Sequence, residues 1–190
     1  MLKNLFLLLL SFVIVTACVP TSANKDAEKK YFDVAGLIHQ QISELNKRKP
    51  KVEKNTSLSG EQGKISTDTL DWNKELALFK EADINSPALR DSYEIIEDKA
   101  SKTVTYTSKE EKLKVKEIKL QYNENSQITA LNINQLKIIF AENNQLYEIQ
   151  RVMEMTLKNS LLNSYSIKGF QKVAMKDSLV YEINAKVSGL

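Results

Sequence analysis

The last third of the chain alternates between apolar and polar residues, and this alternation restricts the fold more than any other feature of the sequence. Six residues occupy every second position of one segment and are apolar except for one arginine: Tyr147, Ile149, Arg151, Met153, Met155 and Leu157. Most residues between them are polar, and 179–187 repeats the pattern near the C-terminus. A period of two is that of a β-strand with one buried face. The sequence therefore predicts a sheet with one apolar and one polar side.

Strand-like patterns also occur upstream, interrupted in two places. The strand-like segments are 103–106, 113–122, 128–140, 147–157, 165–173 and 179–187. Within them the phase slips at Lys116–Glu117 and again between Ile133 and Leu136. A β-bulge, which inserts one extra residue into a strand, produces such a slip. We therefore expect an antiparallel meander of about six long strands, curved by its bulges.

Two segments have helical periodicity. From Ala27 to Asn46 apolar residues recur every three or four positions, and Pro50 follows shortly after. A second helix is predicted over 71–82, with Asp71 as its N-cap. Each helix has one apolar side, which requires a surface to pack against.

These patterns together define the predicted fold class, which is α+β. A curved antiparallel meander packs on the two amphipathic helices, and short edge strands form over 51–58 and 65–70. The predicted core residues are Ile38, Ile42, Trp72, Leu76, Phe79, Ile118, Leu120, Ile149, Met153, Tyr181 and Ile183.

Composition excludes one class of partner. The formal net charge is only +3, and no long basic block occurs, so the chain lacks the sustained positive field of a nucleic-acid-binding protein. With three prolines, five glycines and no internal repeat, little of the chain is typical of a linker. No nucleic acid is expected as a partner.

The N-terminus has the parts of an export signal. Lys3 is followed by the apolar run 5–15, which is too short to span a bilayer, and then by Val15-Thr16-Ala17-Cys18. This segment resembles the lipobox of bacterial lipoproteins, which has an aliphatic residue three before a cysteine and a small residue just before it. The resemblance implies that Cys18 receives a diacylglyceryl group, that cleavage separates Ala17 from Cys18, and that the new amine is acylated.

The same resemblance suggests an organisation and a location. Residues 1–17 are a signal peptide, 18–26 a lipidated tether, and 27–190 a single α+β domain. When fully extended, the seven residues 19–25 reach only about 25 Å, so the domain would stay close to the membrane. Because Val19 rather than aspartate follows Cys18, the expected location is the outer membrane, with the domain facing the periplasm or the outside.

The sequence contains no catalytic or metal-binding constellation. His39 is the only histidine and lies beside the apolar stripe of the first helix, which is typical of a helix-surface residue. Residues 83–94 place acidic and amide side chains at some positions of a calcium loop, but Pro87 and Ala88 replace a ligand and the required glycine. We expect no enzyme activity, no cofactor and no metal, although a metal-free hydrolase stays an alternative.

Arg151 is the one charged residue on the apolar side of its strand. It could pair with Glu44 or Glu75 on a helix, extend to the end of the sheet, or face a ligand cavity. In the last case Met153 and Met155 would line the cavity beside it.

Two functions are consistent with these features. The first is a non-enzymatic binding or scaffolding module that holds an envelope protein at the membrane. The second follows from the order of lipobox, tether, helix and long strands, which resembles the layout of the lipoprotein carriers and receptors of the LolA/LolB type. That resemblance implies a carrier that holds a lipid or other hydrophobic ligand in the concave face of its sheet.

Overall fold

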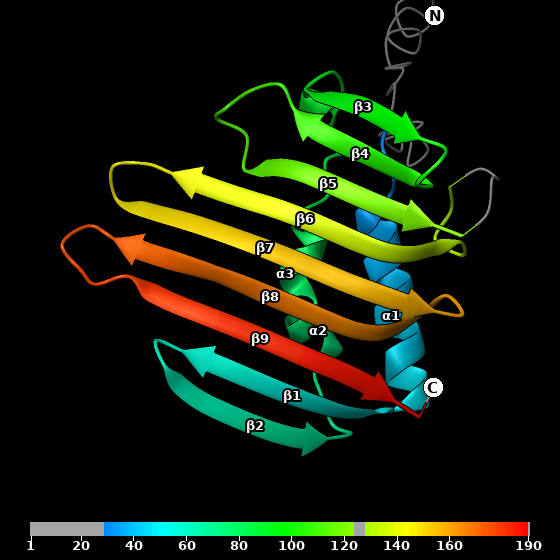
Figure 1. Ribbon diagram of the computed structural model, residues 1–190, viewed down its shortest axis with the longest axis vertical. Coiled ribbons are helices and arrows are strands. Elements are labelled where there is room, and N and C mark those ends of the chain that lie inside the picture. The colour runs from blue at the N-terminus through cyan, green and yellow to red at the C-terminus, as the bar shows by residue number, and fades with distance from the viewer. Residues whose placement is uncertain (1–28, 124–127, 190) are drawn as a thin grey trace, which may run out of the picture.

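A single antiparallel sheet of nine strands dominates the fold (Figure 1). The computed structural model describes residues 29–123 and 128–189. The strands are β1 (Lys51–Leu58), β2 (Glu61–Thr67), β3 (Tyr93–Asp98), β4 (Thr103–Ser108), β5 (Val115–Tyr122), β6 (Ile133–Asn143), β7 (Tyr147–Lys158), β8 (Leu161–Val173) and β9 (Leu179–Ser188). The helices are α1 (Val34–Arg48), α2 (Trp72–Glu75), α3 (Ala77–Lys80) and the short 3-10 helix η1 (Pro87–Leu89).

The order of the strands is that of a meander with a hairpin added at one side. Strands β3 to β9 lie next to one another in chain order, and β1 then pairs with β9 while β2 lies outside β1. The predicted antiparallel meander is thus confirmed, and the sheet is open, with β2 and β3 at its edges. The prediction that 51–58 is an edge strand is wrong, because β1 is hydrogen-bonded to a strand on each side, β2 and β9.

Both predicted bulges are present. The register between β5 and β6 shifts between Val115 and Glu117, and shifts again where Tyr122 pairs with Ile133 while Gln121 pairs with Gln135. In the first shift Lys116 is the extra residue of β5, and in the second Asn134 is the extra residue of β6. Each position is the one at which the apolar alternation of the sequence changes phase.

The helices α1, α2 and α3 lie on one face of the sheet, behind it in the view of Figure 1. One continuous core joins them to the strands, and its largest fully buried side chains include Leu37, Leu45, Phe79, Ile118 and Leu136. The class α+β therefore holds in its broad form, although the helices are few and short.

The predicted helix over 27–46 begins seven residues too early. Asp33 is the N-cap, since its side chain accepts a hydrogen bond of 2.8 Å from the amide of Gly36. The apolar pattern misled the prediction because Tyr31 is buried just before the helix. The helix ends at Lys49, which adopts the left-handed conformation with φ 48°.

The single second helix predicted over 71–82 is also wrong. Asp71 is indeed the N-cap and accepts a bond of 3.3 Å from the amide of Lys74. The chain leaves helical geometry at Leu76, however, so α2 and α3 are two separate turns. Trp72, Leu76 and Phe79 are nevertheless all buried, as predicted.

The helices cover only one end of the sheet. Side chains on the helix side of β7 are buried from Met153 onward but only half-buried from Tyr147 to Arg151. Ile149, Tyr181 and Ile183 were predicted as core and are only half-buried for the same reason. Figure 1 shows the ends of β6 to β9 that extend past the helices, on the left.

Candidate binding surfaces

The face of the sheet opposite the helices is polar and carries two neighbouring hollows. The first, of about 400 Å³, lies over β1, β9, β8 and β7, and its floor consists of short side chains such as Thr156, Ser164 and Ser166. The second, of about 470 Å³, lies over β7, β6, β5 and β4 and is lined by longer polar side chains such as Gln121 and Lys119. Seven adjacent strands therefore contribute to one polar surface, which we call the open face.

An ion pair lies where the two hollows meet. Lys137 Nζ is 3.2 Å from a carboxylate oxygen of Glu154, and Glu154 lines both hollows. Both side chains are 38% exposed, so solvent screens this pair and it contributes little to stability. The two charges stay available to a partner.

Other groups on the open face are already ordered by one another. The hydroxyls of Thr156 and Ser164 are 2.6 Å apart, and Asn184 donates to Glu182 at 2.7 Å. Hydrogen bonds from Asn184 and then Lys168 hold the pKa of the Glu182 carboxyl below its usual range. The surface thus offers preformed hydroxyl, amide and charged groups, which suit hydrogen bonding to a polar partner.

The sulfur side chains proposed to line a cavity lie in the core. Met153 is 1% exposed and Met155 is 0% exposed, and both are covered by the helix layer. Side chains of that layer fill the space next to them, including Phe79, whose ring meets Tyr165 edge-on at 6.3 Å between ring centroids.

Arg151 lies beside these methionines, at the end of the sheet that the helices leave uncovered. Its Nε donates to Tyr181 Oη at 2.9 Å, and its guanidinium lies 5.1 Å from the centroid of the Phe140 ring. Gly169 stands between Arg151 and Tyr181 in the register of the strands. A Cβ on Gly169 would lie 2.2 Å from the carbonyl oxygen of Gln150, so the close approach of β7 and β8 here requires glycine.

The expected helix partners of Arg151 are engaged elsewhere. Glu44 pairs with Lys47 and Arg48 along α1. Among the residues that the structure describes, Arg151 makes no ion pair with a carboxylate within 4.0 Å. The prediction of a pairing with Glu44 or Glu75 is therefore wrong, and a neutral hydroxyl and an aromatic ring take that place.

Glu75 instead fixes α2 to the sheet. It lies 2.5 Å from Lys54 Nζ of β1, and Tyr165 Oη of β8 donates to the same carboxylate. Burial, together with the Glu75 carboxylate, raises the pKa of the Tyr165 hydroxyl well above its usual value. No sequence pattern indicates this cluster, because it depends on the order of strands that are far apart in the chain.

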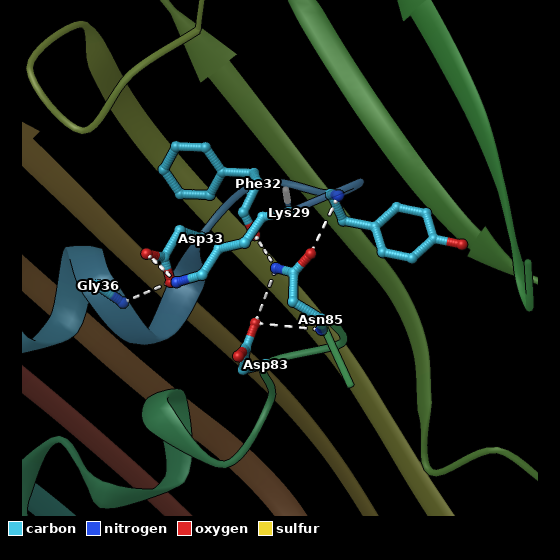
Figure 2. A network of polar contacts seen from close by, with 7 residues as sticks. Lys29, Phe32, Asp33, Gly36, Asp83 and Asn85 are labelled. Carbon is cyan, nitrogen blue, oxygen red and sulfur yellow. Dashed lines mark hydrogen bonds and ion pairs between the residues drawn. The ribbon is translucent and has the colours of Figure 1, made fainter. Parts of the chain in front are cut away.

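Where the described chain begins, it is held by the loop after α3. Figure 2 shows the Asn85 side chain, whose Oδ1 accepts from the Tyr31 amide at 3.0 Å and whose Nδ2 donates to the Phe32 carbonyl at 3.1 Å. Asp83 accepts a further bond of 3.0 Å from Asn85. These bonds fix the position at which the described chain begins.

The remaining candidate residues are placed as follows. His39 is exposed on α1. Asp83 is engaged with Asn85, and Asp91 pairs with Lys30 at 2.5 Å. Within 29–123 and 128–189, no group of three or more histidine, cysteine or acidic residues is arranged to hold a metal ion. Ala17 and Cys18 lie outside the described residues.

Comparison of the chain with models of known protein families, with curated proteins and with solved structures finds no match. In the described part of the chain, no helix combines the length and the apolar character needed to cross a bilayer.

Proposed function

We propose that this protein is a lipid-anchored envelope module that binds a partner protein through the open face of its sheet and has no enzymatic role. Cys18 would hold it in the outer membrane, and the domain would project into the periplasm or to the outside. The observation that carries the proposal is the pair of polar hollows over seven adjacent strands.

The position of the helices supports this choice of surface. They bury the apolar face over much of its length, whereas the open face exposes hydroxyls, amides and both signs of charge. A non-obligate interface is about as polar as ordinary protein surface, and shape and hydrogen-bond complementarity distinguish it. A hollow between longer side chains can receive a protruding part of a partner and so provides shape complementarity.

Site-specific crosslinking tests the proposal. A photo-reactive residue in place of Asn184, which lines the first hollow, should give a discrete crosslinked protein in intact cells. Ser166→Trp fills the hollow and should abolish that product. Lys168→Trp, on the same strand and face but outside both hollows, should preserve it. A product that survives Ser166→Trp, or no product at all, would contradict the proposal.

The uncovered end of the other face favours a second candidate function, a carrier of a hydrophobic ligand. Phe140, Ile149 and Tyr181 are half-buried around Arg151. Among the described residues Arg151 makes no ion pair within 4.0 Å, although Glu142 is near enough to interact with its charge. An amphiphile with an anionic head would satisfy both the apolar surface and the charge.

Native mass spectrometry of the purified domain without its own lipid distinguishes the two candidates. A carrier should show a co-purifying anionic lipid, which Arg151→Gln removes and Lys172→Gln, on the exposed end of β8, retains. If the protein carries no ligand in any preparation, the carrier proposal is wrong and the binding-module proposal remains.

A further inference from the structure

β3 forms one edge of the sheet, and its outward peptide groups can be identified. In the described part of the chain β4 is its only strand partner. The Lys109 amide donates to the Ser92 carbonyl at 2.9 Å, so in an antiparallel pair residues 94, 96 and 98 also face β4. The peptide groups of residues 93, 95 and 97 then point outward. The Tyr93 amide fits this assignment, because it donates away from β4 to Tyr31 Oη at 3.3 Å.

The outward edge therefore offers backbone donors and acceptors at Ile95 and Glu97. The side chains of Ile95 and Ile96 are 45% and 53% exposed and lie on opposite faces of the same strand. A strand added beside β3 would satisfy the backbone groups and cover part of both isoleucines. The Tyr93 amide is already bonded to Tyr31 Oη, so the added strand would pair along 94–98.

Charge indicates which strand fits. Glu94 and Glu97 are exposed and take part in no ion pair among the described residues, although Glu97 accepts a hydrogen bond of 3.3 Å from the Tyr122 hydroxyl. Asp98 is occupied with the turn that follows, where it accepts from Ser101. Two copies of β3 paired about Ile96, with the outward Ile95 and Glu97 opposite each other, would place Glu94 opposite Asp98, and like charges directly opposite each other are unfavourable. The same charges attract a strand that carries lysine or arginine.

We propose that the β3 edge binds an extended segment of a partner protein, in which basic residues flank a central pair of apolar residues, as an additional strand of the sheet. This edge is separate from the open face and from the Arg151 end. The proposal therefore does not depend on the proposed function, and either can fail without the other.

Amide hydrogen exchange of the full mature protein tests this with a capped peptide of sequence Lys-Lys-Val-Val-Lys-Lys, whose two valines can lie opposite Ile95 and Ile96 and whose lysines can lie opposite Glu94 and Glu97. The peptide should slow exchange at the Ile95 and Glu97 amides by about tenfold or more. The Glu94 and Ile96 amides, which already face β4, should change little. A capped Glu-Glu-Val-Val-Glu-Glu peptide should have no effect. Unchanged exchange at Ile95 and Glu97, or strong protection there without peptide, would overturn the proposal, because protection without peptide means that this chain itself or a second copy covers the edge.

Two variants separate the contributions of charge and backbone. Glu94→Lys combined with Glu97→Lys should abolish the protection, whereas Glu61→Lys on the opposite edge strand β2 should not. Ile95→Pro removes an outward amide without touching the β3–β4 bonds and should also abolish binding, while Ile95→Val retains it. If Ile95→Pro fails to fold, as thermal unfolding would show, the charge variants decide. Protection that survives the double charge reversal would refute the proposal.

Discussion

At the scale of single residues, Gln41 shows how a buried amide joins distant parts of the chain. It is 0% exposed on α1. Its Nε2 donates to the Ser160 carbonyl at 2.9 Å, and its Oε1 accepts from the Leu162 amide at 2.8 Å. One side chain therefore satisfies two backbone groups of the β7–β8 hairpin, which a sequence pattern cannot reveal.

Gln41→Leu should lower the free energy of unfolding by about 2–3 kcal/mol, because it leaves a buried donor and a buried acceptor without partners. Urea unfolding with an unchanged m-value would measure this loss. Gln40→Leu, at the exposed neighbouring position, should change stability by less than about 0.5 kcal/mol. If the two variants lose the same unfolding free energy, the two hydrogen bonds of Gln41 do not contribute to stability.

Tyr93 makes stability sensitive to alkaline pH. Burial, followed by the nearby Tyr31 and Glu110, raises its pKa to about 12. The folded state therefore holds this proton more tightly than the unfolded chain, whose tyrosines titrate near pH 10. This contribution is fully present below about pH 10 and is lost as pH rises toward 12. Tyr93→Phe should reduce the fall in unfolding free energy over that range, and an unchanged pH profile would contradict the assignment.

At the scale of the elements, periodicity identified most strands and two of the three register shifts in the described sheet, but not the one between Thr156 and Leu157. It also could not fix the helix ends or the position of β1 in the sheet. The buried Tyr31 continues the apolar stripe of α1, whereas Asp33 ends the preceding extended chain. The sequence of β1 is compatible with an edge or an inner position. Its inner position comes from pairing with β9, which lies more than 100 residues later in the chain. The apolar–polar alternation of β7 identifies Arg151 as a charged residue on the apolar face. Its neighbours Phe140 and Tyr181 cannot be identified in this way, because only the register of the strands brings them to Arg151.

The N-cap of α1 can be tested by exchanging one side chain. Asp33→Ala should lower the free energy of unfolding by about 1 kcal/mol, because the Gly36 amide loses its acceptor. Asp33→Asn keeps an oxygen acceptor and should be close to the wild type. Chemical denaturation of the three proteins under the same conditions gives the comparison, and a similar loss in both variants would point to the Lys29–Asp33 ion pair instead.

At the scale of the whole molecule, the start of the described chain is fixed at a defined place on the domain. Asn85 holds Tyr31 and Phe32, and Lys30 pairs with Asp91, so the described chain begins on the side of the sheet that carries the helices. Because residues 19–25 reach only about 25 Å when extended, a lipid on Cys18 would keep that side near the membrane. The open face would then point away from the helix side and toward a partner.

The lipid on Cys18 determines whether this arrangement exists. Metabolic labelling with a fatty-acid probe should label the wild-type protein, which should sediment with membranes. Cys18→Ser should lose the label and leave the membrane fraction, because a thioether to diacylglycerol requires the cysteine sulfur. Ser22→Ala, within the same tether, should behave as the wild type. If Cys18→Ser still labels and sediments, the anchor lies elsewhere, and the orientation of the open face would no longer follow.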